Sequence, residues 1–314
     1  MKKALIALAV LGLSGAAMAQ SSVTLYGKAD AGFGKIELGS APGVGDANNK
    51  TQFISGSTMN AFTSRVGVRG TEDLGGGMKV GFNFESGVDL NSGGTTTSTF
   101  WGRQANLSLS GNWGTLKMGR QYTPSYLIND AFDLTDQANY SVLGDTFALS
   151  TRANSAFAYV SPTFSGLTAM AAFVSKNDCP TPDCGKNVWD VGAMYADGPI
   201  SAGASVNKVS GGKTGYQLGG KYDFGSFLLA ASYNQAVSAS TVRRGFELGG
   251  TLKFGAFSAT LDLTRDTKND WAIKKYTNSM LELKYRMSKR TFLYAAYLHA
   301  DSTNNYGIGI DHNF

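Results

Sequence analysis

An alternation of apolar and polar residues runs from Val23 to the end of the chain and limits the possible folds more than any other feature. In the first segment Val23, Leu25 and Phe33 fall on one face, whereas Lys28 and Asp30 fall on the other. A two-residue repeat is the side-chain period of a β-strand. A face that carries charged residues cannot be buried in a dry core without partners. We therefore expect a long sheet with one apolar side and one side that faces water.

Short turns rich in glycine join the strands in pairs, and longer polar connections join one pair to the next. The predicted turns lie at residues 73–77, 111–114, 162–166, 197–199, 223–225, 254–255 and 288–290. The longer connections lie near residues 36–62, 87–99, 122–151, 174–188, 208–214, 235–242, 265–274 and 300–304. This alternation of short turns with longer connections predicts sixteen antiparallel strands.

These strands have the reverse polarity of a soluble sandwich, because their charge faces the side that would have to form the core. No apolar run after Leu13 approaches the ~18 residues of a membrane helix, which excludes a helical membrane protein. A closed barrel pairs every backbone group in lipid, and strands of about ten residues with aromatic residues beside the short turns are typical of outer-membrane barrels. The predicted fold is an all-β, sixteen-stranded transmembrane barrel, wide enough for an aqueous channel. The alternative, a secreted all-β sandwich, would have no core.

The first nineteen residues have the organisation of a secretory signal peptide. Two lysines precede an apolar stretch over residues 4–13, and the small residues Ala17 and Ala19 follow. We expect cleavage before Gln20, which divides the chain into a leader at 1–19 and a barrel at 20–314. Without the two leader lysines, 26 basic residues face 23 acidic ones, a net charge of +3. This excess is too small to indicate a nucleic-acid partner.

The chain has two cysteines, Cys179 and Cys184, in the sequence Cys-Pro-Thr-Pro-Asp-Cys. In an exported chain such a pair favours a disulfide over a metal site. We expect the bond to close a small ring in the fourth of the longer connections.

The third longer connection, from Tyr122 to Ser150, interrupts the alternation. It contains the aspartates Asp130, Asp133, Asp136 and Asp145 and no Lys or Arg, together with many large apolar residues. Such a long segment without a strand is usually functional or disordered, and its apolar content disfavours disorder. We expect it to fold into the barrel and narrow the pore.

Several segments resemble the general diffusion porins of Gram-negative β-proteobacteria, of the neisserial and Bordetella type. They are SSVTLYGKADAG at the expected mature start, SRVGVRGTEDLGGGMKVGFNFESG from Ser64, GNWGTLKMGRQYTP from Gly111, the run over 152–166 ending in YVSPTFSG, MSKRT from Met287 and YGIGIDHNF at the end. The resemblance implies a homotrimer of sixteen-stranded barrels in the outer membrane, among its lipid and lipopolysaccharide. It also implies that Phe314 belongs to the signal for the outer-membrane assembly machinery.

The resemblance further implies an arginine cluster on the wall that faces the third loop, at Arg65, Arg103 and Arg152. Alternation directs Arg65 and Arg152 inward, but Arg103 shares the outward phase of Leu107 and needs a bulge or a strand end to turn in. The candidates for the whole basic wall are Arg65, Arg103, Arg152, Arg69, Lys28, Lys79 and Lys117. For each arginine the alternative is a solvated surface residue.

On the loop side, Asp130, Asp133 and Asp136 are the candidates for pore-lining charge, and Asp145 for the solvated end of a turn. Opposed walls of charge are how pores select ions. We expect passive diffusion of ions and small hydrophilic solutes with a weak to moderate preference for anions.

The alternative function is a substrate-specific channel for a sugar or another small solute, with Tyr122, Tyr126 and Tyr140 as a sliding track or as packing for the loop. An enzyme is not expected, because neither His299 nor His312 lies in a nucleophile motif. We expect no cofactor and no metal.

Overall fold

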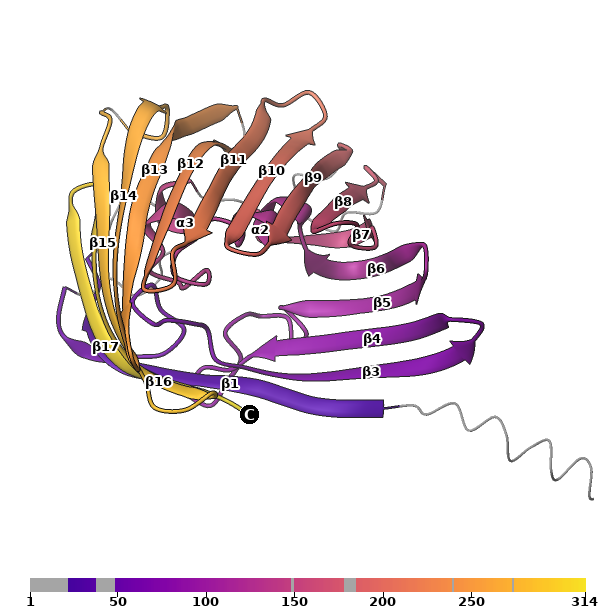
Figure 1. The fold of residues 1–314 in the computed structure, drawn as a ribbon, viewed down its shortest axis with the longest axis horizontal. Helices are drawn as coiled ribbons and strands as arrows, with labels where there is room; N and C mark the ends of the chain where they lie inside the picture. The colour runs from indigo at the N-terminus through magenta and orange to yellow at the C-terminus, as the bar shows by residue number, and fades with distance from the viewer. Residues whose placement is uncertain (1–21, 38–48, 148–149, 178–184, 239, 273) are drawn as a thin grey trace, which may run out of the picture.

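The computed structural model describes residues 22–37, 49–147, 150–177, 185–238, 240–272 and 274–314. Sixteen long strands form the wall, as the sequence predicts (Figure 1). They are β1 (Ser22–Lys35), β3 (Arg65–Gly75), β4 (Met78–Gly87), β5 (Gln104–Gly111), β6 (Gly114–Tyr122), β7 (Arg152–Val160), β8 (Leu167–Val174), β9 (Val188–Asp197), β10 (Ile200–Val209), β11 (Thr214–Asp223), β12 (Phe227–Ser238), β13 (Thr241–Phe254), β14 (Phe257–Asn269), β15 (Thr277–Arg286), β16 (Thr291–Ala300) and β17 (Thr303–Asn313). All seven predicted short turns join the expected strand pairs.

The sheet closes because the first strand is long enough to pair with both of its neighbours. One part of β1 pairs antiparallel with β3, and the other pairs with β17. The terminal Phe314 completes the seam, since its backbone N–H and C=O exchange 3.1 Å hydrogen bonds with Gly27. Closure leaves no open sheet edge along this seam, as a strand assembly in lipid requires.

An additional three-residue strand, β2 (Gln52–Ile54), was not expected from the sequence. It pairs with β1 from Gly32 to Gly34, beyond Lys28, where the pairing of β1 with β3 stops. The residues that follow β2 turn into the barrel, where Asn60 Nδ2 and Tyr294 Oη donate to Asp30 Oδ1 at 2.9 and 2.7 Å. The first longer connection therefore packs partly inside the barrel.

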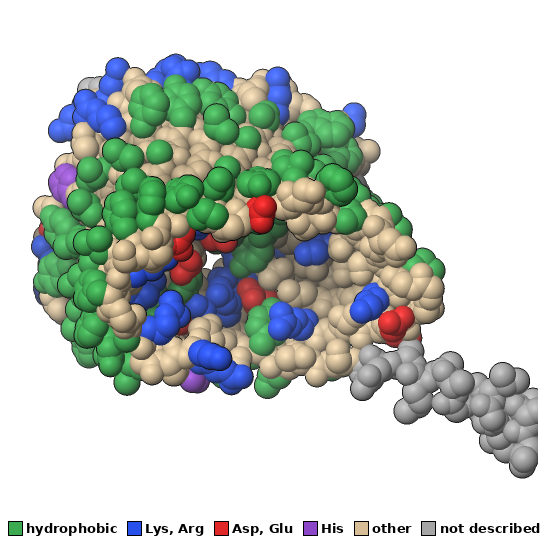
Figure 2. Space-filling view, viewed as in Figure 1, with side chains coloured by type: hydrophobic (Ala, Val, Ile, Leu, Met, Phe, Trp, Pro, Cys, Tyr) green, Lys and Arg blue, Asp and Glu red, His purple; other side chains and the backbone are tan. Residues whose placement is uncertain are grey.

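Strand alternation separates an apolar exterior from a polar interior. On β14, Leu261 and Leu263 are exposed, whereas the intervening Asp262 is fully buried. The same alternation recurs on β15, where Leu281 and Leu283 flank the buried Glu282. Figure 2 shows apolar side chains over the outer surface and charged side chains around the opening. No helix in the described ranges is long and apolar enough to cross a membrane.

The segment between β6 and β7, residues 123–151, is called the inner loop here. It contains two short helices, α2 (Pro124–Asn129) and α3 (Val142–Thr146), both inside the barrel in Figure 1. The Thr123 and Ser141 hydroxyls accept from the backbone N–H groups of Tyr126 and Gly144 and so cap the two helices. Helix α2 packs against β8 to β11, and α3 packs against β14 to β16.

Candidate functional site

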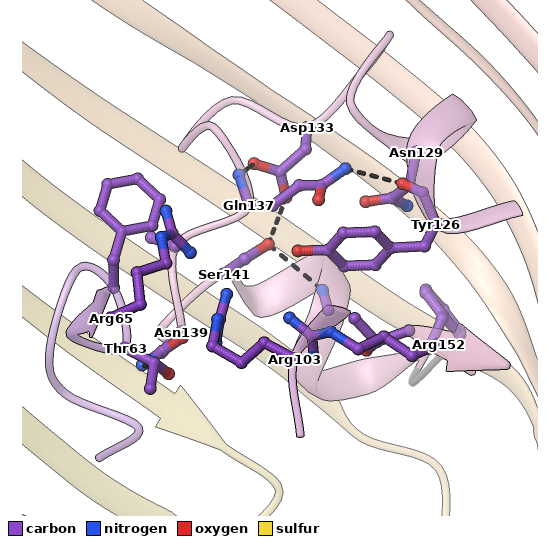
Figure 3. A pocket seen from close by; sticks show the side chains of 15 residues that line it. Thr63, Arg65, Arg103, Tyr126, Asn129, Asp133, Gln137, Asn139, Ser141 and Arg152 are labelled. Atoms are coloured by element: carbon purple, nitrogen blue, oxygen red, sulfur yellow. Dashed lines mark hydrogen bonds between the residues drawn. The ribbon is translucent and has the colours of Figure 1, made fainter. Parts of the chain in front are cut away.

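The candidate site is a cavity of about 290 Å³ between the inner loop and the wall (Figure 3). Arginines border it on one side, and polar side chains of the inner loop border it on the other. The lining residues that matter below are Arg65, Arg103, Arg152, Tyr126, Asp133 and Ser141.

The inner loop is held in place by hydrogen bonds to strands on the opposite part of the wall. The Ser125 backbone N–H and hydroxyl both donate to Asp190 Oδ1, at 3.0 and 2.8 Å. Gln217 Nε2 donates to the Ser125 carbonyl at 2.5 Å. Farther along the loop, Tyr140 Oη donates to Glu282 Oε2 at 2.6 Å. Because these contacts lie on either side of residues 126–139, this part of the loop is fixed across the pore.

The cavity receives the three arginines from three different parts of the wall. Arg65 begins β3 and Arg152 begins β7, and both line the cavity. The Arg152 guanidinium lies 4.6 Å from the Tyr122 ring centroid, and its Nη2 donates to the Tyr122 hydroxyl at 3.0 Å. Arg103 Nη2 donates to the same hydroxyl at 3.2 Å. Tyr122 therefore positions two guanidinium groups beside the cavity.

Arg103 turns inward because it precedes its strand. Strand β5 begins at Gln104, and the Arg103 backbone N–H donates to the Glu85 carbonyl at 3.1 Å. Its side chain also meets this residue, with Arg103 Nε 2.6 Å from Glu85 Oε1. Arg103 therefore lies just outside the end of a strand, as its inward direction requires. Its guanidinium is paired with the Glu85 carboxylate.

The other predicted basic residues do not line this cavity. Lys28 Nζ lies 3.3 Å from Asp311 Oδ1 and 3.4 Å from the Phe62 ring centroid, and Arg69 lies 5.1 Å from the Tyr26 ring centroid. The remaining two, Lys79 on β4 and Lys117 on β6, also lie on strands of the wall.

The four aspartates of the inner loop have different surroundings. Asp133 is only 1% exposed, and its Oδ1 accepts from the Thr135 and Gln137 backbone N–H groups at 2.7 and 2.9 Å. Ser141 donates to its other oxygen. Although Asp133 borders the cavity, most of its hydrogen-bonding capacity holds the loop together.

Asp130 and Asp136 are exposed, whereas Asp145 is half-buried rather than a solvated turn end. Burial raises the pKa of the Asp145 carboxyl to about 6, with repulsion from Asp301 adding to the shift and Arg243 opposing it. The loop charge available to the pore is therefore smaller than four full carboxylates.

Sequence reasoning missed the wall carboxylates Glu85, Asp311 and Glu282, which pair with basic residues inside the barrel. Their inward strand phase was the available signal. It also missed Arg120, whose Nε donates to the Gly102 carbonyl at 2.7 Å and whose Nη1 donates to Asn154 Oδ1 at 2.5 Å. The pairing of β6 with β7 shifts register beside Arg120, so simple alternation does not apply there.

The aromatic candidates divide into two groups. The Tyr122 and Tyr126 rings stack with centroids 5.0 Å apart, and Tyr126 lines the cavity. Tyr140 is fully buried and hydrogen-bonded to the wall, which matches the packing alternative. Cys179 and Cys184 lie outside the described residues. Within the described part of the chain, no group of three His, Cys, Asp or Glu side chains is arranged to hold a metal ion.

Comparison with known proteins assigns the chain to a family. The sequence profile of the Gram-negative porin family matches residues 4–307. Outer membrane porin protein 32 of Delftia acidovorans is 35% identical over 75% of this chain and 70% of its own length. An outer membrane porin of Bordetella pertussis is 31% identical over 74% of this chain and 69% of its own length.

Among solved structures, the anion-selective porin from Comamonas acidovorans has a TM-score of 0.76 at 25% identity and covers 94% of this chain and 100% of its own. These relatives are channels rather than enzymes, and this chain is not an enzyme either. The chain belongs to the Gram-negative porin family and is an integral outer-membrane β-barrel that forms a channel for passive diffusion of small solutes.

Proposed function

We propose that the channel is weakly to moderately anion-selective and that Arg65 and Arg152 contribute most of this preference. The observation that carries the proposal is an asymmetry of charge at the cavity. No carboxylate oxygen lies within 4 Å of either guanidinium in the described part of the chain, whereas Asp133 is bound by its own loop. Guanidinium groups also remain charged at any working pH. The anion selectivity named for the Comamonas acidovorans porin supports the same sign.

The test is ion selectivity in a planar bilayer under a tenfold KCl gradient. The reversal potential of the unmutated channel should favour chloride, and Arg65→Gln and Arg152→Gln should each shift it toward potassium. At an effective dielectric constant of about 20, one charge 4 Å from a passing ion contributes ~4 kcal/mol, so one lost charge is measurable. Lys289→Gln in an exposed turn is the matched control. A potassium preference in the unmutated channel would reverse the assignment and favour the loop aspartates.

A substrate-specific channel is the second candidate, and the stacked pair Tyr122 and Tyr126 is the observation that favours it. Stacked aromatic faces beside guanidinium groups offer a flat surface to a sugar or to an organic anion. Block of the ion current by a sugar at low concentration, and loss of that block in Tyr126→Leu, would support this candidate. An ion current that sugars do not reduce would leave general diffusion as the function of the channel.

The family relationship also supports a trimer that contacts lipopolysaccharide and enters the membrane through the outer-membrane assembly machinery, with Phe314 in the assembly signal. One structural relative, OmpT of Vibrio cholerae, is described in a trimer form. We expect a trimer band in unheated detergent gels and a monomer band after boiling. A monomer measured by light scattering in mild detergent would contradict this.

Two proposals concern residues outside the described part of the chain. Cleavage before Gln20 would be checked by the intact mass of the protein from outer membranes. A disulfide between Cys179 and Cys184 predicts that neither thiol reacts with an alkylating reagent until the protein is reduced. The small ring closed by such a bond limits its stabilising effect to at most ~2–3 kcal/mol.

A further inference from the structure

The inner loop contacts a segment that comes from the arginine side of the cavity. Residues 55–63, between β2 and β3, are called the bracing segment here. Asn139 of the inner loop donates from its backbone N–H to the Ala61 carbonyl at 2.9 Å and from Nδ2 to the Ser57 carbonyl at 3.0 Å. The same Nδ2 lies 3.4 Å from Thr63 Oγ1, and Figure 3 shows the two side chains next to each other. One side chain of the inner loop therefore joins it to the bracing segment.

The bracing segment is fixed to the first strand of the wall. Asp30 Oδ1 on β1 accepts from Asn60 Nδ2 and from the Tyr294 hydroxyl. The other oxygen of this carboxylate accepts from the Phe62 backbone N–H at 2.8 Å. The Asp30 backbone N–H donates to Ser64 Oγ, directly after the bracing segment, at 2.9 Å. Because Asp30 and Asn60 are fully buried, these bonds are shielded from water and hold the bracing segment rigidly to β1.

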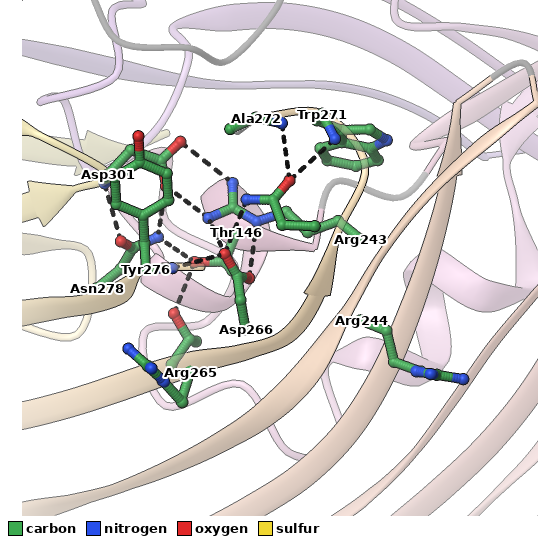
Figure 4. A network of polar contacts seen from close by, with 12 residues as sticks. Thr146, Arg243, Arg244, Arg265, Asp266, Trp271, Ala272, Tyr276, Asn278 and Asp301 are labelled. Carbon is green, nitrogen blue, oxygen red and sulfur yellow. Dashed lines mark hydrogen bonds and ion pairs between the residues drawn. The ribbon is translucent and has the colours of Figure 1, made fainter. Parts of the chain in front are cut away.

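The two ends of the inner loop are each held by several contacts with other parts of the wall. Helix α2 is bound by the hydrogen bonds with β9 and β11 described above. At the end of α3, Thr146 Oγ1 accepts from Asn278 Nδ2 at 2.9 Å. Figure 4 shows Asn278 within a buried network in which the Arg243 guanidinium bridges Asp266 and Asp301 at 2.9 and 2.5 Å. Loss of one contact at either end therefore leaves other contacts in place.

Between these ends, the backbone of the inner loop is strained. Residues 136–139 are called the tip here, and its first two residues, Asp136 and Gln137, have φ angles of 61° and 59°. Residues with a side chain rarely adopt this left-handed conformation, which persists only where the surrounding contacts impose it. Gln137 is held by its backbone N–H to Asp133 Oδ1 at 2.9 Å and by its Nε2 to the Tyr126 carbonyl at 2.7 Å. Both partners belong to the inner loop, so these bonds do not tie the tip to the wall.

We propose that Asn139 is a positioning residue of the channel, which holds the tip against the bracing segment and so sets the width of the passage between the inner loop and Arg65. Thr63 lies two residues before Arg65, and Asn139, Thr63 and Arg65 all line the cavity. The Asn139 side chain thus joins the two borders of the cavity to each other. When its bonds are lost, the strained tip is free to leave the bracing segment, and the passage widens. The width of the passage does not depend on which ion the channel prefers, so this role is independent of the anion selectivity proposed above.

The test is single-channel recording of Asn139→Leu in a planar bilayer. Leucine keeps the branched shape of the side chain but cannot donate to the bracing segment. Because leucine is also the larger side chain, a wider passage in this variant cannot come from lost volume. Asn129→Leu is the matched control, since Asn129 lines the same cavity but donates to Gln217 Oε1 on the wall, at 3.3 Å.

Two further measurements accompany the recordings. Poly(ethylene glycol) of graded size in the bath reports the width of the passage through the largest polymer that still lowers the conductance. Heat-modifiable gel migration verifies that each variant is folded and compares their stabilities. Thr63→Val removes an acceptor from the bracing segment while keeping the shape of the side chain, so it tests the same contact from the opposite side.

In Asn139→Leu, the channel should spend about fivefold more time in conductance levels above the main one, in line with the loss of one net hydrogen bond. It should also admit larger polymers, whereas Asn129→Leu should behave as the unmutated channel does because α2 keeps its other contacts. Thr63→Val should change the conductance in the same direction but less, because Asn139 keeps its bond to the Ser57 carbonyl.

A residue with a merely structural role would lower the temperature of the gel shift and leave the conductance of the folded channel unchanged. That result in Asn139→Leu would overturn the proposal. Equal changes in Asn129→Leu and Asn139→Leu would also overturn it, because they would trace the effect to the lost polarity of the lining. If Asn139→Leu does not fold, Thr63→Val decides, and an unchanged conductance and polymer cut-off in that variant would count against the role of Asn139.

Discussion

Arg103 Nε lies 2.6 Å from Glu85 Oε1 inside the barrel, so the arginine that reaches the cavity from before β5 is neutralised by a carboxylate of the neighbouring strand. Both residues are more than nine-tenths buried. Charge at the cavity therefore depends on how wall residues pair, as well as on how many arginines the wall contains.

Replacing Glu85 should expose the charge of its partner. In Glu85→Gln the amide oxygen can still accept from Arg103 Nε, but the negative charge is gone. The reversal potential in a tenfold KCl gradient should move further toward chloride. Glu72→Gln, at an exposed position of β3, is the control and should leave the potential unchanged. A shift toward potassium in Glu85→Gln would show that this carboxylate does not compensate Arg103.

Selectivity should depend on pH through Asp145, whose pKa burial raises to about 6. Above pH 6 this carboxyl is ionised and opposes anions, and below pH 6 it is neutral. Chloride preference should therefore increase as the pH falls from 8 to 5, with a midpoint near 6. Asp145→Asn should remove this step. A step that survives in Asp145→Asn would assign the titration to another group.

The seam at the end of the chain should be sensitive to a single methyl group. A Cβ on Gly27 would lie 2.2 Å from Cζ of Phe314, so Gly27→Ala must displace the terminal ring. Such overpacking costs about 1–3 kcal/mol. In heat-modifiability gels, the temperature at which the band of the folded barrel is replaced by the band of the unfolded chain should therefore fall. Gly144→Ala, whose methyl would meet nothing closer than 3.7 Å, should have little effect on this temperature.

Two buried glutamates should respond in opposite ways to the same substitution. Glu247 is close to Asp262, and Glu247 Oε1 and both Asp262 carboxylate oxygens lack hydrogen-bond partners in the described chain. Glu247→Gln replaces one of two facing carboxyl groups by an amide that can donate to the other, so it should stabilise the barrel by about 1–2 kcal/mol. Glu282 instead pairs with Lys284 at 3.3 Å, so Glu282→Gln should destabilise it. Unfolding in urea measures the free-energy change caused by each substitution. Destabilisation by Glu247→Gln would contradict repulsion between the Glu247 and Asp262 carboxyl groups.

The strand pattern by itself determined the barrel. A strict two-residue repeat with charge on one face and Leu or Phe on the other has one low-energy solution in lipid, because every backbone group must be paired and every charge must face water. The turn positions followed from local glycine and proline chemistry. The inward position of Arg65 followed from the same repeat.

Only the tertiary structure decided which charges remain free at the cavity. Arg103 turns inward because a strand begins at Gln104, Arg120 lies where β6 and β7 change register, and Glu85 meets Arg103 across adjacent strands. Strand ends, bulges and cross-strand partners depend on pairing between distant segments, which a local period does not encode. Asp133 is hydrogen-bonded within its own loop, but the position of that loop across the pore depends on contacts with the distant strands that carry Asp190, Gln217 and Glu282.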